Sequence, residues 1–171
     1  MTLVTAHSPL RTVRLARVAS SMLRIAAILS HRSTCRRARV GAVVTDSEHL
    51  QILGIGYNGS ARGLRNGCES DTPGACGCVH AELNALLKAP GAQPDKWLFT
   101  THSPCISCAR AIANSGITHV IYLGAYRDAS GIALLEQVGI AVAQHRDALA
   151  IALLEDDQLH IYRDATLARL R

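Results

Sequence analysis

The sequence predicts an α/β fold of three layers, in which a mixed central sheet of about five strands lies between helices. Segments typical of strands alternate along the chain with segments whose apolar residues recur at helical spacing. The first two strands are close enough to pair as an antiparallel hairpin, whereas helices that can act as crossovers separate the later ones. The length of 171 residues, 49% of them hydrophobic, suits one domain with its own core.

The first half of the chain is expected to form a helix, a hairpin and a long loop. The segments at 39–46 and 50–59 read as strands joined through Ser-Glu-His. From 57 to 78 the chain is rich in Gly, Asn, Ser, Arg and Cys, which indicates an irregular loop that is functional or held by something else. The first helix should cover the core with apolar residues spaced three and four apart, namely Leu15, Val18, Met22, Ile25 and Leu29.

Beyond the loop, helical and strand patterns alternate again. A helix is expected from near Val79 until the Pro-Gly pair at 90–91. The helix that opens with "SPCISC" is predicted to take Ser103 as its N-cap and Pro104 as its first residue, and to end at Gly116. The other expected elements are strands at 95–102, 117–124 and 140–143 and helices at 128–139 and 147–155.

These elements are expected to form a single domain over residues 1–171. Its core should span about 11–145, and 146–171 form a C-terminal extension to which the pattern assigns only the helix at 147–155. No segment approaches the roughly 20 apolar residues of a membrane span, and the first residues lack the pattern of a secretion signal. We therefore expect a cytoplasmic protein without a membrane partner.

Positive charge is concentrated in the first quarter of the chain. The net charge is +5, and eight arginines precede the first acidic residue, Asp46. Such a segment could attract phosphate groups or nucleic acid, or it could be the solvated face of a helix. Aromatic residues make up only 4% of the chain, which is few for a surface that stacks single-stranded bases. An anionic small molecule is therefore a better expected partner than nucleic acid.

Six cysteines in a chain without a secretion signal indicate metal binding or catalysis rather than disulfides. His80 and Glu82, followed by Pro104, Cys105 and Cys108, match the H-x-E and P-C-x-x-C signature of zinc-dependent deaminases. The first half alone could be two ordinary polar residues, and the second alone could be part of a structural zinc site or a redox pair. Both together favour the deaminase interpretation.

The chemistry of this pattern can be worked out from the residues. Cys105 and Cys108 are three apart at the start of a helix, so that both sulfur atoms face one way and the helix N-terminus favours thiolates. His80 would be a third ligand, which leaves one position of a tetrahedral zinc for a water molecule with a lowered pKa. Glu82 need not bind the metal and is expected to move the proton of that water.

Four cysteines remain once Cys105 and Cys108 are assigned, and four is the number that a closed structural zinc site requires. A second zinc at this site would hold the long loop against the region after the first helix. Two alternatives stay open: some of these residues could be buried free thiols, or three could bind the metal without Cys76 or Cys78. The four are Cys35, Cys68, Cys76 and Cys78.

The segments "STCRRARVGAVV", "GIGYNGSARGL", "VHAELNALL", "TTHSPCISCARAIANSGITHVIY" and "AYRD" resemble the deoxycytidylate deaminase family, which has the cytidine deaminase-like fold. The resemblance covers residues of about 20–142. It implies that His80, Cys105 and Cys108 bind a catalytic zinc and that Glu82 is the proton shuttle. Some phage and bacterial members carry an extra zinc.

The resemblance also implies contacts with a nucleotide. Asn58, in an expected turn at 56–59, would contact the sugar or phosphate, or that segment could be only a tight turn. Tyr126 would lie over the substrate, or could be half-buried packing. Backbone groups near Ala81 and Ser103 would orient the ring.

Arg62 and Arg65 are our own candidates for the phosphate, because guanidinium groups suit phosphate oxygens. Both could instead be solvated loop residues.

The implied reaction is hydrolytic deamination of a cytosine deoxynucleotide, dCMP to dUMP and ammonia, in pyrimidine deoxynucleotide metabolism. The sequence leaves dCTP, a modified dCMP and deoxycytidine open as substrates. The alternatives are a deaminase of tRNA or single-stranded DNA, whose binding would weaken steeply with salt, and a non-catalytic zinc protein. Resemblance further implies a homo-oligomer, often a hexamer, in some members regulated by dCTP and dTTP.

Overall fold

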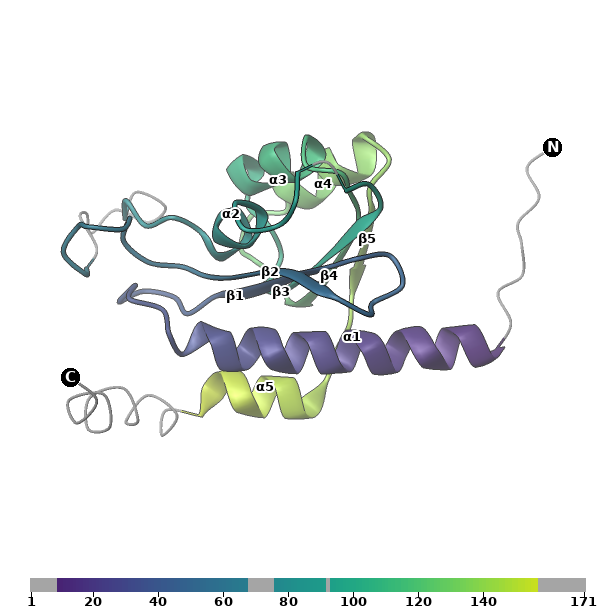
Figure 1. The fold of residues 1–171 in the computed structure, drawn as a ribbon. Helices are drawn as coiled ribbons and strands as arrows, with labels where there is room; N and C mark the ends of the chain where they lie inside the picture. The colour runs from purple at the N-terminus through teal and green to yellow at the C-terminus, as the bar shows by residue number, and fades with distance from the viewer. Residues whose placement is uncertain (1–8, 68–75, 92, 157–171) are drawn as a thin grey trace.

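The computed structural model describes residues 9–67, 76–91 and 93–156. Within these ranges, five strands form one mixed sheet in the order β2-β1-β3-β4-β5, with helices on both faces (Figure 1). This confirms the predicted α/β sheet. The strands are β1 (Gly41–Thr45), β2 (Ile52–Tyr57), β3 (Lys96–His102), β4 (Ile117–Gly124) and β5 (Ala141–Gln144).

The helices form a layer on each side of the sheet. Helices α1 and α5 lie on one side, and α2, α3 and α4 lie on the other (Figure 1). No helix among the described residues is long and apolar enough to cross a membrane. The bounds of the helices are α1 (Pro9–Ser30), α2 (Ala81–Leu86), α3 (Ile106–Ala113), α4 (Ser130–Gln137) and α5 (Ala148–Glu155).

Strand directions follow the connections in the sequence. Strand β1 pairs antiparallel with β2 through the predicted short hairpin, and antiparallel with β3 on its other side. Strands β3, β4 and β5 are parallel, and the helices α3 and α4 connect them. The carboxyl end of β3 therefore leads directly to the start of α3, where the motif cysteines lie.

Alternate residues of the central strands supply two separate cores. Leu98 packs with α2, α3 and α4 on one face, whereas the next residue, Phe99, packs with α1 and α5 on the other. In β1, Val44 and Val43 divide between the two faces in the same way. Each face of the central strands therefore packs on its own hydrophobic core, and the two cores hold the sheet in place beneath the site.

The first helix buries a wider arc than the predicted stripe. Four of the five predicted residues, from Val18 to Leu29, pack at the margin of the core, while Leu23 and Ala26 between them are fully buried. The reason is that α1 contacts both the sheet and α5. Two packing partners bury a wider arc of a helix than the stripe that one partner requires.

The predicted C-terminal helix is present as α5, and one carboxylate joins it to α1. Asp147 is the N-cap of α5, because its side chain accepts a hydrogen bond of 2.7 Å from the Ala150 amide. The same carboxylate accepts two hydrogen bonds, of 3.0 and 2.9 Å, from the guanidinium group of Arg24.

The predicted N-cap of α3 is wrong. The chain stays extended through Cys105 (φ −72°, ψ 169°), which is the N-cap, so that α3 begins at Ile106 rather than at Pro104. Ser103 has other partners: its amide donates to the Gly124 carbonyl (2.9 Å), and its hydroxyl accepts from the Tyr126 amide (2.7 Å). These bonds tie the end of β3 to the end of β4.

The predicted turn at 56–59 is also different in the structure. Gly56 and Tyr57 belong to β2, and Gly59 continues the extended chain by pairing with Val79 through two hydrogen bonds of 3.1 and 2.8 Å. This bridge brings the segment that precedes α2 alongside the end of β2. Part of the predicted irregular loop therefore has a sheet-like attachment at its base.

Candidate active site

The histidine and the two cysteines of the motif lie together. His80 Nδ1 is 3.5 Å from Cys105 Sγ and 3.3 Å from Cys108 Sγ, and the three candidate ligand atoms lie within 4.8 Å of one another. Bonds of about 2.0–2.3 Å to one tetrahedral zinc place ligand atoms roughly 3.5 Å apart. The three side chains therefore fit a single zinc ion.

The starts of two helices position these ligands. His80 is the N-cap of α2 and Cys105 the N-cap of α3, each with an extended backbone, and Cys108 lies one turn along α3. Because an N-cap residue and the residue three positions later project from the same side, the two sulfur atoms can reach one ion. The three candidate ligand atoms lie together although the predicted cap of α3 was wrong.

Two glycines let neighbouring elements approach these helix starts closely. A Cβ atom at Gly56 of β2 would lie only 2.0 Å from the carbonyl oxygen of Ala81, the first residue of α2. A Cβ at Gly131 of α4 would lie 2.0 Å from the carbonyl oxygen of Pro104, just before Cys105. Backbone packing therefore holds both helix starts, and a methyl group at either glycine would displace them.

Hydrogen bonds within this cluster shift the pKa values of its three members. Hydrogen bonds from Cys108 and then His80 lower the pKa of Cys105 to about 3. The bond to Cys105, together with burial, raises the pKa of Cys108, and the pKa of His80 is raised mainly by its bond to Cys105. Cys108 and His80 donate protons to the Cys105 thiolate, and a bound cation would take the place of these protons.

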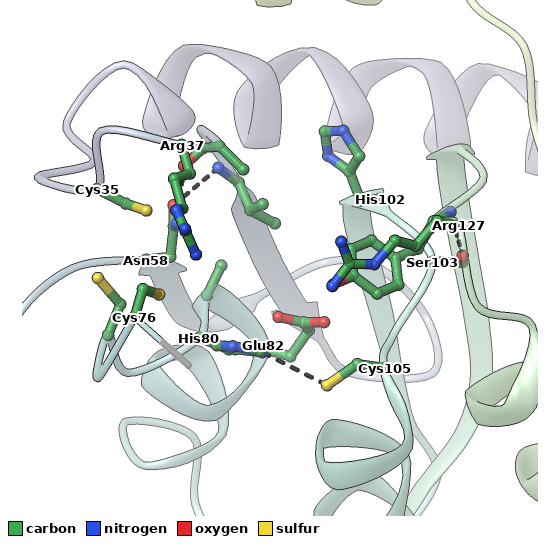
Figure 2. Close-up of a pocket in the computed structure, with 15 residues that line it drawn as sticks. Cys35, Arg37, Asn58, Cys76, His80, Glu82, His102, Ser103, Cys105 and Arg127 are labelled. Carbon is green, nitrogen blue, oxygen red and sulfur yellow. Dashed lines mark hydrogen bonds between the residues drawn. The ribbon is translucent and has the colours of Figure 1, made fainter. Parts of the chain in front are cut away.

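Glu82 lies on the first turn of α2, beside the three ligands. Its side chain is only 4% exposed, and burial raises its pKa. Figure 2 shows its carboxyl group directed into a pocket above the Cys105 sulfur. A buried carboxyl group beside the three candidate ligands is placed to take up and release a proton.

The pocket above the cluster has a volume of about 340 Å³, in the range of small-molecule sites. Four predicted substrate contacts line it: Asn58, Ala81, Ser103 and Tyr126. Asn58 also has a structural task, since its side chain accepts a hydrogen bond from the Val40 amide and donates one to the Ala38 carbonyl, both 2.8 Å.

The arginines at the pocket are not those predicted. Arg62 and Arg65 are exposed and are not among the described residues that line it. Arg37 and Arg127 line it instead, and Figure 2 shows them on two sides of the Glu82 carboxyl group. The guanidinium carbon of Arg127 lies 5.4 Å from the centre of the Tyr126 ring, a stacking that orients it.

His102 is a further pocket residue that the sequence analysis missed. It ends β3, its pKa is lowered by burial, and its Nδ1 atom lies 3.1 Å from the Thr101 hydroxyl. The sequence signal was present, because His102 directly precedes the Ser-Pro-Cys segment at the carboxyl end of a predicted strand. Arg37 had no comparable signal among the neighbouring arginines.

A second cluster lies at the edge of the same pocket. The sulfur atoms of Cys35, Cys76 and Cys78 lie within 4.8 Å of one another. Burial is the main cause that raises the pKa of Cys78. The fourth predicted ligand, Cys68, lies outside the described residues, but its neighbour Gly67 has its carbonyl oxygen 3.9 Å from Cys78 Sγ.

Comparison with known proteins places this fold and site in a class, that of the zinc-binding deaminases. Residues 17–124 match the family described as the cytidine and deoxycytidylate deaminase zinc-binding region. The match covers more than half of the chain, and the chain belongs to this family. The range includes both cysteine clusters and Glu82.

Individual relatives and structures agree with this family. Deoxycytidylate deaminase of Saccharomyces cerevisiae is 33% identical over 138 residues, which cover 73% of this chain and 44% of the yeast protein. That of Mycobacterium phage D29 is 37% identical over 121 residues, 58% of this chain and 89% of the phage protein. This chain thus spans less than half the length of the yeast relative.

A solved structure also resembles most of this fold. The dCMP deaminase of the cyanophage S-TIM5, in complex with dCMP and dUMP, is 32% identical in sequence. It aligns with a TM-score of 0.60 over 81% of this chain and 99% of that chain. The five-stranded sheet and its helices are therefore those of a cytidine deaminase-like protein.

Proposed function

We propose that the protein is a zinc-dependent hydrolase that deaminates a cytosine deoxynucleotide, namely dCMP, to dUMP and ammonia. The observation that carries the proposal is the buried Glu82 carboxyl group beside the three candidate zinc ligands, at the floor of a pocket lined by two arginines. The names of the yeast and phage relatives, and the dCMP and dUMP in the cyanophage structure, support this substrate.

His80, Cys105 and Cys108 would hold the catalytic zinc. The bound ion would leave one coordination position open and lower the pKa of a water molecule toward neutrality, which supplies the nucleophile. The lowered pKa of Cys105 favours the thiolate that binds metal. The close packing behind both helix starts supports a rigid site.

Glu82 would move the protons of the reaction. Its carboxylate takes a proton from the attacking water and gives it to ring N3 while the new C–O bond forms at C4. The proton of the new C4 hydroxyl then passes through Glu82 to the amino group, so that the C–N bond breaks, ammonia leaves and the C4 carbonyl of the uracil forms. A carboxyl group whose pKa burial raises is suited to act first as base and then as acid.

The other pocket residues would orient the nucleotide. Backbone groups at Ala81 and Ser103 would face the cytosine ring, and Tyr126 would lie over the substrate. Asn58, which is bonded to the pocket residues Ala38 and Val40, would contact the sugar. We assign the phosphate to Arg37 and Arg127, in place of Arg62 and Arg65, because guanidinium groups on two sides of a pocket can share its oxygens.

A second zinc would bind at Cys35, Cys76 and Cys78, with Cys68 as the fourth ligand. The spacing of the three sulfur atoms and the approach of Gly67 to Cys78 support this assignment. In this assignment the ion is structural, since four cysteine ligands fill a tetrahedral zinc. We also propose that the protein is a cytoplasmic homo-oligomer, with a hexamer as one candidate form, and that dCTP and dTTP regulate it.

The test is deamination of dCMP, dCTP, deoxycytidine and CMP in parallel, followed by loss of cytosine absorbance, with and without added dCTP. The proposal expects the highest kcat/KM with dCMP. If dCMP is turned over slowly, a modified dCMP should be tested as a fifth substrate. Turnover of a cytosine-containing oligonucleotide, with no turnover of the four small substrates, would contradict the proposal.

A further inference from the structure

Arg37 lies on a short segment at the rim of the pocket, residues 33–39, which we call the arginine segment. Two different anchors hold it. We infer that the metal site of Cys35, Cys76 and Cys78 positions Arg37, so that the second metal sets the preference for a phosphorylated over an unphosphorylated substrate. The inference rests on the proposed function for its choice of substrates. The inference gives this second metal site a role in substrate selection in addition to its role in stabilising the fold.

The first anchor is the cysteine cluster. Cys35 precedes Arg37 by two residues, and its sulfur lies with those of Cys76 and Cys78, which come from the segment before α2. Figure 2 shows the Cys35 and Cys76 side chains at the same edge of the pocket as Arg37. A metal ion bound by these residues would join two segments that are 41 residues apart in the sequence.

The second anchor is the buried Asn58 side chain. It accepts a hydrogen bond from Val40 and donates one to Ala38, the residue next to Arg37. Backbone and side-chain bonds also join Thr34 to Asn58 (3.3 Å) and to Ser60 (3.1 Å). Protein hydrogen bonds therefore hold residue 34, just before Cys35, and residues 38 and 40, just after Arg37.

Residues 35–37 thus lie between two points that protein hydrogen bonds hold, and a metal bound to Cys35 would add an attachment within this stretch. Residues 33–39 have no helix or strand, and Arg36, Arg37 and Ala38 are exposed. A segment without regular structure takes its conformation from its attachments, so that loss of the metal would release the Cys35 side chain between the points held at Thr34 and Ala38. The Arg37 side chain would then lose its fixed direction into the pocket.

Arg127 provides the internal comparison. It lies on the connection between β4 and α4, where it stacks on Tyr126, whose amide is bonded to Ser103. None of these contacts involves the loop cysteines. Loss of the second metal is therefore expected to disable one of the two phosphate-binding arginines and to spare the other.

The size of the effect follows from the charged contact that would be lost. A hydrogen bond between a guanidinium and a phosphate typically changes affinity by about tenfold or more. Deoxycytidine lacks the phosphate and should be insensitive to Arg37. The expected signature is therefore a change in selectivity between the two substrates, whereas a general loss of structure would lower turnover of both.

The test compares Cys76→Ser, Arg37→Ala and the double variant with the wild-type protein, and uses Arg36→Ala as a matched control. Cys76→Ser removes a metal ligand without altering the arginine segment itself. We measure kcat/KM for dCMP and deoxycytidine, binding of dUMP and deoxyuridine by calorimetry, and zinc per chain. Cys35→Ser is a second ligand variant in case Cys76→Ser does not fold.

The inference expects the ratio of kcat/KM for dCMP to that for deoxycytidine to fall about tenfold in Cys76→Ser and in Arg37→Ala, with no further fall in the double variant. Binding of dUMP should weaken in parallel, while Arg36→Ala keeps the wild-type ratio. An unchanged ratio after loss of one zinc, or equal losses with both substrates, would overturn it. Absence of dCMP turnover in the wild-type protein would overturn the proposed function, and the binding measurements would still decide the inference.

Discussion

The two cysteine clusters use similar side chains but are built in different ways. His80, Cys105 and Cys108 project from the starts of α2 and α3, which pack on the sheet and against neighbouring backbone at Gly56 and Gly131. The other cluster joins Cys35, after α1, to the irregular segment that carries Cys76 and Cys78. Regular structure places the first set of ligands, whereas the second set lies between segments without helix or strand.

The difference indicates what each site requires. A catalytic ion needs a fixed position relative to Glu82 and the substrate, and helix starts packed on a sheet provide it before any metal binds. A structural ion can instead contribute the free energy that orders its own loop. The segment from Cys76 to Glu82 serves both, because Cys76 and Cys78 lie with one cluster and His80 with the other.

The largest expected effect separates chemistry from metal binding at the first cluster. Glu82→Gln should lower kcat for dCMP by about two to four orders of magnitude, because the amide cannot carry the proton. Zinc per chain and the melting temperature should stay close to wild type. Glu155→Gln, at the exposed end of α5, is the control and should retain full activity. Near-normal turnover in Glu82→Gln would remove Glu82 from the mechanism.

Gly131→Ala tests whether packing at the helix starts makes the first site rigid. The added methyl group would overlap the Pro104 carbonyl oxygen, so that the chain before Cys105 must move. Overpacking of this kind costs about 1–3 kcal/mol of stability, and we expect weaker zinc binding at this site by chelator competition. The matched control is Gly91→Ala, since a Cβ there meets nothing within 4 Å. Wild-type zinc affinity in Gly131→Ala would show that the site tolerates displacement.

Cys76→Ser addresses the second cluster. The variant should lose one zinc per chain and melt several degrees lower, since each 1 kcal/mol shifts the melting temperature of a domain of this size by about 2–4 °C. The remaining zinc should still support deamination of deoxycytidine. Metal analysis and differential scanning calorimetry measure both quantities. Unchanged metal content would end the assignment of the second site.

The smallest effect lies far from both clusters, at the contact between α1 and α5. The Arg24 guanidinium holds the pKa of Asp147 well below its usual range. A carboxyl group with a depressed pKa in the folded state stabilises it above the unfolded pKa of about 4, and that stabilisation is lost as the pH falls further.

Asp147→Asn keeps a good helix cap but removes the charge. We expect its melting temperature to be about 2 °C below wild type at pH 7, where an exposed arginine limits the value of the pair. The difference should shrink as the pH falls toward 3, and zinc content should not change. A deficit that grows on acidification would contradict the ion-pair account.

The sequence predicted the alternation of elements well because it depends on local patterns. The hairpin of β1 and β2, the crossover helices and α5 all follow from apolar periodicity and short connections. The proximity of His80, Cys105 and Cys108 was predicted because the two halves of the motif each open a helix and one strand separates them.

The features that the sequence missed depend on contacts between distant segments. Ser103 resembles an N-cap in the local sequence. In the structure its hydrogen-bonding groups are instead bonded to Tyr126 and Gly124, over twenty residues later. No local pattern distinguishes Arg37 from Arg36, although in the structure Arg37 lines the pocket and is next to Ala38, whose carbonyl is bonded to Asn58. Substrate contacts are thus less predictable than metal ligands, whose spacing is set within short motifs.

The division of the Cys76–Glu82 segment between two metal sites is tested most directly by counting zinc. Zinc per folded chain should be measured by mass spectrometry for the wild-type protein, Cys76→Ser and Cys105→Ser. The account predicts two ions in the wild type and one in each variant, with deaminase activity abolished only in Cys105→Ser. A single zinc in the wild-type protein, or loss of all zinc in Cys76→Ser, would contradict it.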